Sequence, residues 1–265
     1  MSELSIATWN VNSIKARLAN LLDWLRDNRP DVLLLQEVKC VAEAFPHEPI
    51  AELGYHSVVF GQKSYNGVAI LSRHPLKEVR RGLPGEAEDR QARYIEATTA
   101  GLRVASIYLP NGNPVDSDKF AYKIRWLERL RAHAARLLED DDPVVLGGDY
   151  NVIPEERDCW DPAAWAEDAL FRPESRRGFR ALLYLGYYDA FRARHPETGN
   201  AYTYWDYQGG AFQLDRGIRI DHILLSPPAV DRLVDAVIDS EPRGRPKASD
   251  HTPLVVTLER PPVTP

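Results

Sequence analysis

Apolar residues recur along the chain in two rhythms, and each rhythm predicts a different element. Short runs in which nearly every residue is apolar are typical of strands that are buried on both faces. Such runs, together with shorter alternating ones, lie at residues 4–9, 31–36, 55–60, 68–72, 94–99, 102–108, 143–147, 202–205, 220–226, 234–238 and 254–258. We predict a strand at each of these positions.

Three other segments repeat apolar residues every three or four positions, which indicates helices with one buried face. Residues 13–28 form the first, with Ser13 as the expected N-cap and Pro30 beyond its last turn. The other two predicted helices span residues 119–138 and 175–185.

The order of these elements predicts the architecture. The first half reads strand, helix, strand, helix and then several strands, and the second half repeats this outline loosely without a repeat of fixed period. No linker divides the chain. We therefore expect one α/β domain over residues 1–265, in which two mixed sheets pack face to face with helices outside, a four-layer α/β/β/α sandwich.

Composition changes this picture little. Hydrophobic residues make up 44% and charged residues 27% of the 265 residues, as in ordinary globular proteins. We see neither an apolar run of membrane-spanning length nor a signal peptide, and Cys40 and Cys159 lack the companions of a zinc site. We expect a cytoplasmic protein without membrane association.

The net charge of −6 argues against a protein that clamps DNA by electrostatics alone. It argues less against an enzyme, because a bound cation offsets the negative charge of a carboxylate site. Basic clusters at residues 172–180, at Arg216 and Arg219, and at residues 243–247 could each face a phosphate backbone. A solvated charged face explains any one of them equally well.

Polar and acidic side chains stand where the predicted strands begin or end. They are Asn10, Asn12, Glu37, Tyr108, Asn111, Asp149, Asn151, Asp221, Asp250 and His251. If the strands share one sheet edge, these side chains converge. Carboxylate and amide oxygens suit Mg²⁺, and phosphodiester hydrolysis needs a cation, an activated water and help for the leaving oxygen. Each feature alone is weak, since Gly-Asp at a strand end is usually a turn, and only their joint occurrence carries the argument.

With these residues in view, the sequence resembles the exonuclease III family of abasic-site endonucleases, a branch of the endonuclease/exonuclease/phosphatase superfamily with the deoxyribonuclease-I-like fold. The matching stretches follow one another in the expected order over essentially the whole chain. They are residues 8–12 (Thr-Trp-Asn-Val-Asn), 35–39 (Leu-Gln-Glu-Val-Lys), 66–70 (Asn-Gly-Val-Ala-Ile), 108–112 (Tyr-Leu-Pro-Asn-Gly), 147–151 (Gly-Gly-Asp-Tyr-Asn), 202–206 (Tyr-Thr-Tyr-Trp-Asp), 216–222 (Arg-Gly-Ile-Arg-Ile-Asp-His) and 249–253 (Ser-Asp-His-Thr-Pro).

The resemblance implies a metal site. Glu37 would be the principal ligand, and Asn10 and Asp250 would support the metal directly or through water. Asp149 would orient or deprotonate the attacking water beside the metal. Asn151 would hold the phosphate or that water, and the implied metal-site residues are Asn10, Glu37, Asp149, Asn151 and Asp250. Mg²⁺ is the implied cofactor, with Mn²⁺ as the alternative.

The resemblance also implies roles for three further catalytic residues. His251 would donate to the scissile phosphate and stabilise charge on it. Asp221 would orient His251, as a buried carboxylate orients a catalytic histidine in other enzymes. Tyr108 would contact the phosphate or the leaving group.

Substrate choice rests on two other stretches. In the repair family, residues equivalent to 202–205 and 216–221 build a small apolar pocket that takes a sugar without its base and is too small for an intact nucleotide. The implied DNA and pocket residues here are Asn111, Tyr204, Trp205, Arg216, Ile218 and Ile220. Ile218 and Asn111 depart from the residues that some relatives carry. Residues 155–172, with Trp160 and Trp165, match the family only loosely, and we expect them to contribute to DNA contact near the site.

The implied function is cleavage of the DNA backbone 5′ to abasic sites, with 3′–5′ removal of nucleotides or blocking groups, in base excision repair. Double-stranded DNA with abasic sites or 3′ ends is the expected partner of a monomeric enzyme of bacterial type, which would associate with the nucleoid through its DNA. A phosphodiesterase or phosphatase for lipid or inositol phosphates is the alternative enzyme. A non-catalytic binding protein that keeps only the fold is the third hypothesis.

Overall fold

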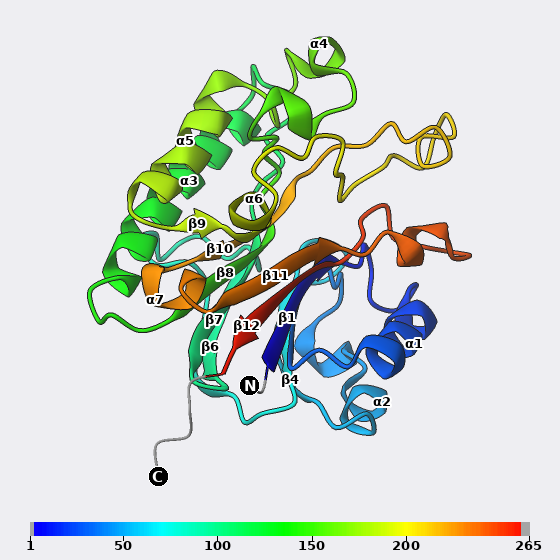
Figure 1. Cartoon of the computed structure of the whole chain (residues 1–265), viewed down its shortest axis with the longest axis vertical. Coiled ribbons are helices and arrows are strands. Elements are labelled where there is room, and N and C mark those ends of the chain that lie inside the picture. The colour runs from blue at the N-terminus through cyan, green and yellow to red at the C-terminus, as the bar shows by residue number, and fades with distance from the viewer. Residues whose placement is uncertain (1–2, 261–265) are drawn as a thin grey trace.

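Two six-stranded sheets lie face to face in the computed structural model, which describes residues 3–260 (Figure 1). The first sheet has the order β11 (Leu233–Ile238), β12 (Leu254–Glu259), β1 (Glu3–Asn10), β2 (Val32–Gln36), β4 (Val68–Ser72) and β3 (His56–Phe60). The second has the order β5 (Lys77–Arg81), β6 (Tyr94–Thr99), β7 (Leu102–Tyr108), β8 (Val144–Asp149), β10 (Asp221–Leu225) and β9 (Tyr188–Asp189).

Helices cover the outer face of each sheet (Figure 1). The first sheet is covered by α1 (Leu18–Asn28) and α2 (His47–Ala51), and the second by α3 (Asp118–Leu137) and α5 (Pro173–Tyr184). The shorter helices are α4 (Pro162–Trp165), α6 (Ala190–Arg194) and α7 (Pro227–Val230), with 3₁₀ turns η1 (Ala42–Ala44), η2 (Glu156–Asp158) and η3 (Glu241–Gly244). The predicted four-layer α/β/β/α sandwich is confirmed.

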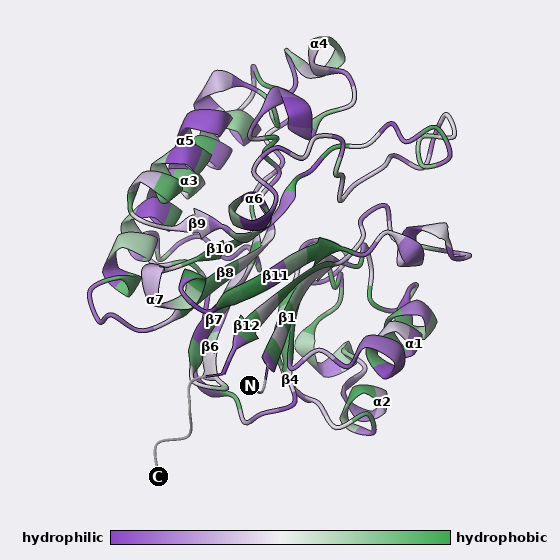
Figure 2. Ribbon diagram, in the orientation of Figure 1, coloured by the Kyte–Doolittle hydropathy of each residue, from purple (hydrophilic) through white to green (hydrophobic). Residues whose placement is uncertain are grey.

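The strand β2 shows why its sequence is an uninterrupted apolar run. Successive side chains of a strand point to opposite faces. Val32 and Leu34 belong to the apolar layer between the two sheets, whereas Leu33 and Leu35 pack beneath the helices of the first sheet. The hydrophobic colouring of the central strands in Figure 2 reflects this burial on both faces.

Each sheet is built around one parallel pair of strands. β1 pairs in parallel with β2 across α1, and β7 pairs in parallel with β8 across α3. Antiparallel strands flank both pairs. The loose repetition in the sequence is thus a repeated sheet pattern. The expectation that the polar side chains share one sheet edge needs correction. They come from the ends of two parallel pairs, one in each of the two facing sheets.

The first predicted helix begins later than expected. Residues 13–28 were assigned to it, but α1 starts at Leu18. Ser13 has a φ of 91°, a backbone conformation outside any right-handed helix, and it is therefore not the N-cap. Its amide instead donates to the carbonyl of Glu37, which ties this segment to the end of β2.

The prediction of a strand at residues 202–205 is wrong. Tyr204 forms only isolated bridges, one with Ile218 and one with His251. These bridges tie three loops together rather than extending a sheet. The edge strand β5 was not predicted, because its sequence Lys-Glu-Val-Arg-Arg is largely polar and exposed and shows no apolar run.

Candidate active site

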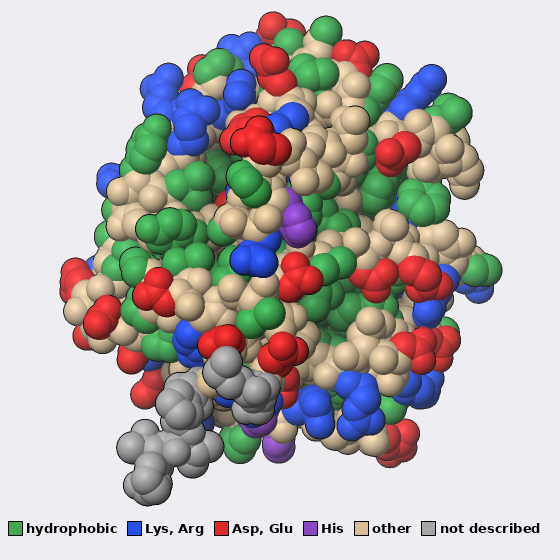
Figure 3. All heavy atoms as spheres, in the orientation of Figure 1, with side chains coloured by type: hydrophobic (Ala, Val, Ile, Leu, Met, Phe, Trp, Pro, Cys, Tyr) green, Lys and Arg blue, Asp and Glu red, His purple; other side chains and the backbone are tan. Residues whose placement is uncertain are grey.

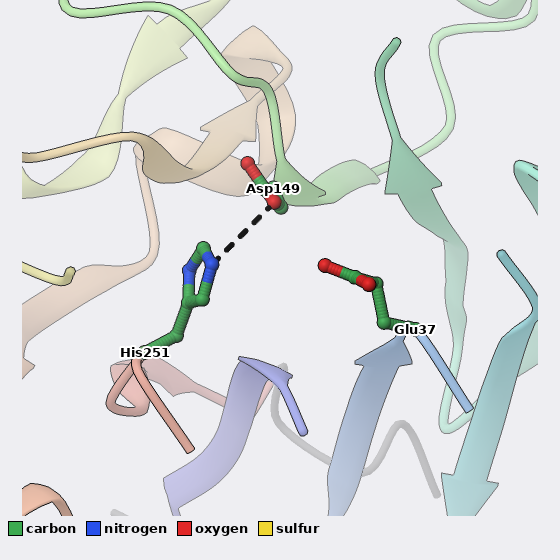
Figure 4. A group of neighbouring side chains, drawn as sticks. All are labelled: Glu37, Asp149 and His251. Atoms are coloured by element: carbon green, nitrogen blue, oxygen red, sulfur yellow. Dashed lines mark ion pairs between the residues drawn. The ribbon is translucent and has the colours of Figure 1, made fainter. Parts of the chain in front are cut away.

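A buried carboxylate, Asp149, lies at the end of β8 in the middle of a polar cluster (Figure 4). One of its oxygens accepts the side-chain amide of Asn10 at 2.9 Å, and the other accepts the backbone N–H of Asn151 at 2.9 Å. The same Asn10 nitrogen donates to Glu37 at 2.9 Å. Asn10 therefore bridges two carboxylates that would otherwise repel each other.

An imidazole and a second carboxylate complete the cluster on the other side. His251 Nδ1 lies 2.8 Å from Asp221 Oδ2, and His251 Nε2 lies 3.8 Å from Asp149 Oδ2. Burial alone would lower the pKa of His251, but Asp221 and Asp149 outweigh it and raise that pKa above its usual range. Burial raises the pKa of Asp149. The geometry therefore favours a cationic His251, which is a hydrogen-bond donor and not a metal ligand.

Glu37 follows β2 with a φ of 51°, a turn that directs its side chain toward Asp149 (Figure 4). Its other oxygen pairs with Lys39 at 2.8 Å. Burial would raise the pKa of Glu37, but Lys39 and the hydrogen bonds outweigh it and lower that pKa. Lys39 also contacts Asn12, whose amide donates to Asp250 at 3.0 Å. Glu37 is therefore ionised and linked to Asp250 through two side chains.

A cavity of about 250 Å³ opens onto this cluster. Its lining consists of Glu37, Tyr108, Asn111, Asn113, Asp149, Asn151, Trp165, Asp168, Leu170, Tyr204, Ile220, Asp250 and His251. Burial and the nearby carboxylates raise the pKa of Tyr108 well above its usual range, so this phenol stays protonated. Asn151 donates to the carbonyl of Leu109 at 2.9 Å and accepts from Asn111 at 3.2 Å. The cavity lining thus combines acidic, amide and donor groups with apolar side chains.

The donor chemistry fits a hard metal cation. Ligand atoms of Glu37, Asp149 and His251 lie within 4.8 Å of one another. His251 is held as a cation by two carboxylates, which leaves the oxygens of Glu37 and Asp149, with Asn10 and Asp250 close by, as the better ligands. Oxygen ligands of this kind suit Mg²⁺, Ca²⁺ and Mn²⁺.

The family profile described as "Endonuclease/Exonuclease/phosphatase family" matches residues 7–251. Exodeoxyribonuclease III of Haemophilus influenzae is 34% identical over 262 residues, which cover 95% of this chain and 98% of that protein. The chain belongs to the exonuclease III branch of this family.

Solved structures agree with this membership of the exonuclease III branch. An AP endonuclease from Archaeoglobus fulgidus superposes with a TM-score of 0.93 at 40% identity, covering 97% of this chain and 99% of that one. The 3′ phosphatase NExo from Neisseria, solved with a product DNA hairpin, superposes with a TM-score of 0.94 at 41% identity and covers 97% and 99%.

Most of the site residues that were predicted from the sequence of this chain lie together at one place. Asn10, Glu37, Tyr108, Asn111, Asp149, Asn151, Asp221, Asp250 and His251 lie in or directly behind the cavity. Tyr204 and Ile220 form part of its wall. Arg216 and Ile218 line a neighbouring cavity, which also has Tyr204 in its wall.

Trp205 requires a correction. It lines neither cavity and is only 4% exposed, because its ring packs with Tyr202, Ala211 and Phe212. Its indole nitrogen donates to Asp215 at 3.1 Å. Trp205 therefore supports the loop that carries Tyr204, and its predicted place in the pocket is wrong.

Arg219 requires a second correction, since the sequence offered it as a phosphate contact. Its side chain is fully buried and pairs with Asp158 at 2.7 Å and with Asp189 at 2.8 Å. The cluster at residues 172–180 does reach the surface, where Arg177 and Arg180 are exposed on α5. Figure 3 shows basic side chains gathered over this helix.

The sequence assigned no individual role to Asn113, Asp168 and Leu170, which also line the cavity. Trp165 was named only within residues 155–172, the loosely matching segment that was expected to contact DNA near the site, and it lines the cavity as well. Both oxygens of Asp168 accept from Asn113 at 3.1 Å, which fixes the loop after α4 against the loop after β7. Lys39 was also missed, although it lies in the matching stretch at residues 35–39. Its place two residues after Glu37, with which it forms an ion pair, was the signal available in the sequence.

Lys123 also escaped the sequence analysis, although it holds three loops of the site in place. It is fully buried on α3, and its Nζ donates to the carbonyls of Asn111 at 3.0 Å, Asn151 at 2.6 Å and Ala169 at 3.1 Å. Burial lowers the pKa of Lys123 to about 7. Three acceptors nevertheless require three N–H donors, which only the ammonium form provides.

Replacing Lys123 tests this interpretation. Lys123→Met keeps the aliphatic stem and leaves three carbonyls without a donor, so we expect a loss of about 1–3 kcal/mol in the free energy of unfolding. We expect kcat of the metal-dependent reaction to fall roughly 10- to 100-fold with little change in KM, because small displacements of catalytic groups slow the reaction strongly. Denaturant melts and steady-state kinetics measure both. Lys119→Met, at an exposed position of the same helix, is the control, and equal kcat values for the two variants would contradict the role.

Proposed function

We propose that this chain is a Mg²⁺-dependent DNA-repair phosphodiesterase that cleaves the backbone 5′ to abasic sites and trims blocked or ordinary 3′ ends. The observation that carries the proposal is the juxtaposition of the carboxylate and imidazole cluster with the apolar wall of Tyr204 and Ile220 in one cavity. Such a wall suits a sugar that has lost its base. The names of the similar proteins, an AP endonuclease and a 3′ phosphatase solved with a DNA hairpin, support the same substrate class.

In this proposal Glu37 would hold the metal beside Asp149, with Asn10 and Asp250 in support. A Mg²⁺ ion held there would supply positive charge to neutralise the phosphate and to help the leaving oxygen. Asp149 is positioned by Asn10 and by the backbone of Asn151 to accept the proton of an attacking water.

The remaining groups act on the phosphate. His251 donates from Nε2, while its Nδ1 remains bonded to Asp221, which fixes the ring and stabilises its charge. Tyr108, protonated, donates to the phosphate or the leaving group. Asn151 lines the same cavity as His251 and Tyr108 and holds the phosphate or the water.

Metal dependence gives the first test. The enzyme should incise a duplex that contains one abasic-site analogue in the presence of Mg²⁺ and be inert in EDTA. Glu37→Ala should raise the Mg²⁺ concentration needed for half-maximal activity by roughly 10- to 100-fold, as losses around a metal site do. Glu48→Ala, at an exposed position of α2, is the control. Incision that persists in EDTA, or an unchanged Mg²⁺ requirement in Glu37→Ala, would refute the metal assignment.

The alternative substrate class is tested on the same preparation. Activity on inositol phosphates or sphingomyelin, and none on DNA, would replace this proposal by the alternative. Within residues 3–260 no helix has the length and hydropathy to cross a membrane. The proposal treats residues 1–265 as one catalytic domain that acts as a monomer.

A further inference from the structure

A second cavity, of about 190 Å³, adjoins the catalytic one and shares Trp165 and Tyr204 as walls. Its other lining residues are Trp160, Asp206, Gln208, Gly209, Ala211, Arg216 and Ile218. The catalytic cluster makes no use of this space. A group held in the catalytic cavity therefore has a neighbouring compartment with three aromatic side chains in its lining.

Trp160 gives this compartment its most distinctive surface. Trp160 is 40% exposed, so part of its large aromatic surface remains open to a ligand. The guanidinium of Arg216 lies 5.1 Å from the centre of its ring. The backbone N–H of Trp160 donates to the carbonyl of Gly217 at 3.1 Å, which fixes the tryptophan to the segment that carries Ile218. The indole is thus partly exposed, with a guanidinium over its ring and an anchored backbone.

We propose that this second cavity binds the nucleobase of the nucleotide whose sugar and phosphate occupy the catalytic cavity. The inference rests on the proposed function and says where the base lies when an ordinary 3′-terminal nucleotide is removed. A cavity of about 150 Å³ accommodates benzene, so the space here is large enough for an aromatic ring. Aromatic faces stack on bases of any sequence, and arginine adds a cation–π contribution.

The polar lining residues fit the same occupant. Asp206, Gln208 and Arg216 add polar groups to the aromatic and aliphatic side chains of this cavity. A base has a flat apolar face and a hydrogen-bonding edge, and this combination of side chains matches both. A lipid chain would leave the polar side chains unpaired, and a free phosphate would find only Arg216 as a cationic partner among the lining residues.

The two compartments should therefore be used differently by two substrates. A 3′-terminal nucleotide fills both cavities, whereas an abasic sugar fills only the catalytic one. Loss of the stacking face should slow removal of the terminal nucleotide more than it slows abasic incision. The ratio of the two rates reports on the second cavity and cancels effects that are common to both reactions.

The test compares single-turnover rate constants on two DNA duplexes, one with a recessed 3′-terminal deoxyadenosine and one with an internal tetrahydrofuran abasic analogue. In Trp160→Ala the ratio of nucleotide removal to abasic incision should fall about tenfold, within the range of one lost base-stacking contact. Trp160→Phe, which keeps an aromatic face, should restore most of the ratio. Tyr184→Ala removes an aromatic that is 83% exposed on α5 and should leave the ratio at the wild-type value.

An unchanged ratio in Trp160→Ala, or a ratio that Trp160→Phe does not restore, would overturn the inference while leaving the proposed function intact. Absence of both activities in the wild-type enzyme would instead refute the proposed function. Thermal melts of each variant exclude unfolding as the cause, and the partial exposure of Trp160 makes its replacement mild.

Discussion

Asp149→Asn should lower the turnover number on abasic-site DNA by roughly 10²- to 10⁴-fold, the range that a general acid–base group contributes. Its carboxylate lies between Asn10 and His251 at the centre of the cavity, and the amide that replaces it cannot accept a proton from water. Affinity for DNA should remain close to that of the wild type, because the apolar wall and the basic surface are unchanged. Rapid-quench kinetics and equilibrium binding to the same duplex measure the two quantities.

A matched control separates this effect from a general change in charge. Asp140→Asn removes one negative charge at an exposed position beyond α3 and should keep the wild-type turnover number. A near-normal turnover number in Asp149→Asn would remove this residue from the mechanism. A large loss of DNA affinity would instead make Asp149 part of substrate binding.

Arg219→Ala should lower the free energy of unfolding by about 3–5 kcal/mol, the cost of removing one partner from a buried ion pair. The guanidinium is fully buried and satisfies Asp158 and Asp189 together, and it also contacts His222 at 3.0 Å. Burial would raise the pKa of Asp189, but Arg219 and His222 outweigh it and hold that pKa well below its usual range. Without Arg219, both carboxylates remain buried with one cation fewer.

Thermal unfolding measures this loss, and the melting temperature should fall by roughly 10 °C, given the few degrees per kcal/mol that a domain of this size shows. Arg180→Ala, at an exposed position of α5, should change it by little. A melting temperature within 2 °C of the wild type in Arg219→Ala would show that the buried network contributes specificity rather than stability.

The fold could be predicted from the sequence wherever burial leaves a rhythm. Strands such as β2 and β8 are apolar on both faces, and α3 carries a clear apolar stripe. Prediction failed where backbone geometry, not hydrophobicity, decides the structure. The positive φ of Ser13 prevents a helix from starting there, so α1 begins only at Leu18. The aromatic run at residues 202–205 lies in a loop, where Tyr204 bridges to Ile218 and His251.

The site could be predicted in part for the same reason. Polar residues at strand ends, such as Glu37 and Asp149, indicate a site because each parallel pair brings its carboxyl ends together and the two sheets face each other. No such pattern marks Lys123 and Arg219, because the sequence does not distinguish a buried lysine or arginine from a solvated one. Only their partners, carbonyls in one case and carboxylates in the other, reveal what they do.

The most direct test of the central claim is the position and chemistry of the cut in DNA. A duplex with one tetrahydrofuran residue and a 5′-labelled damaged strand is incubated with the enzyme and Mg²⁺, and the product is then offered to a DNA polymerase. We predict a single labelled product that ends immediately 5′ to the analogue and that the polymerase extends at once, which requires a 3′-hydroxyl. An uncut strand, or a product that the polymerase cannot extend, would contradict the assignment.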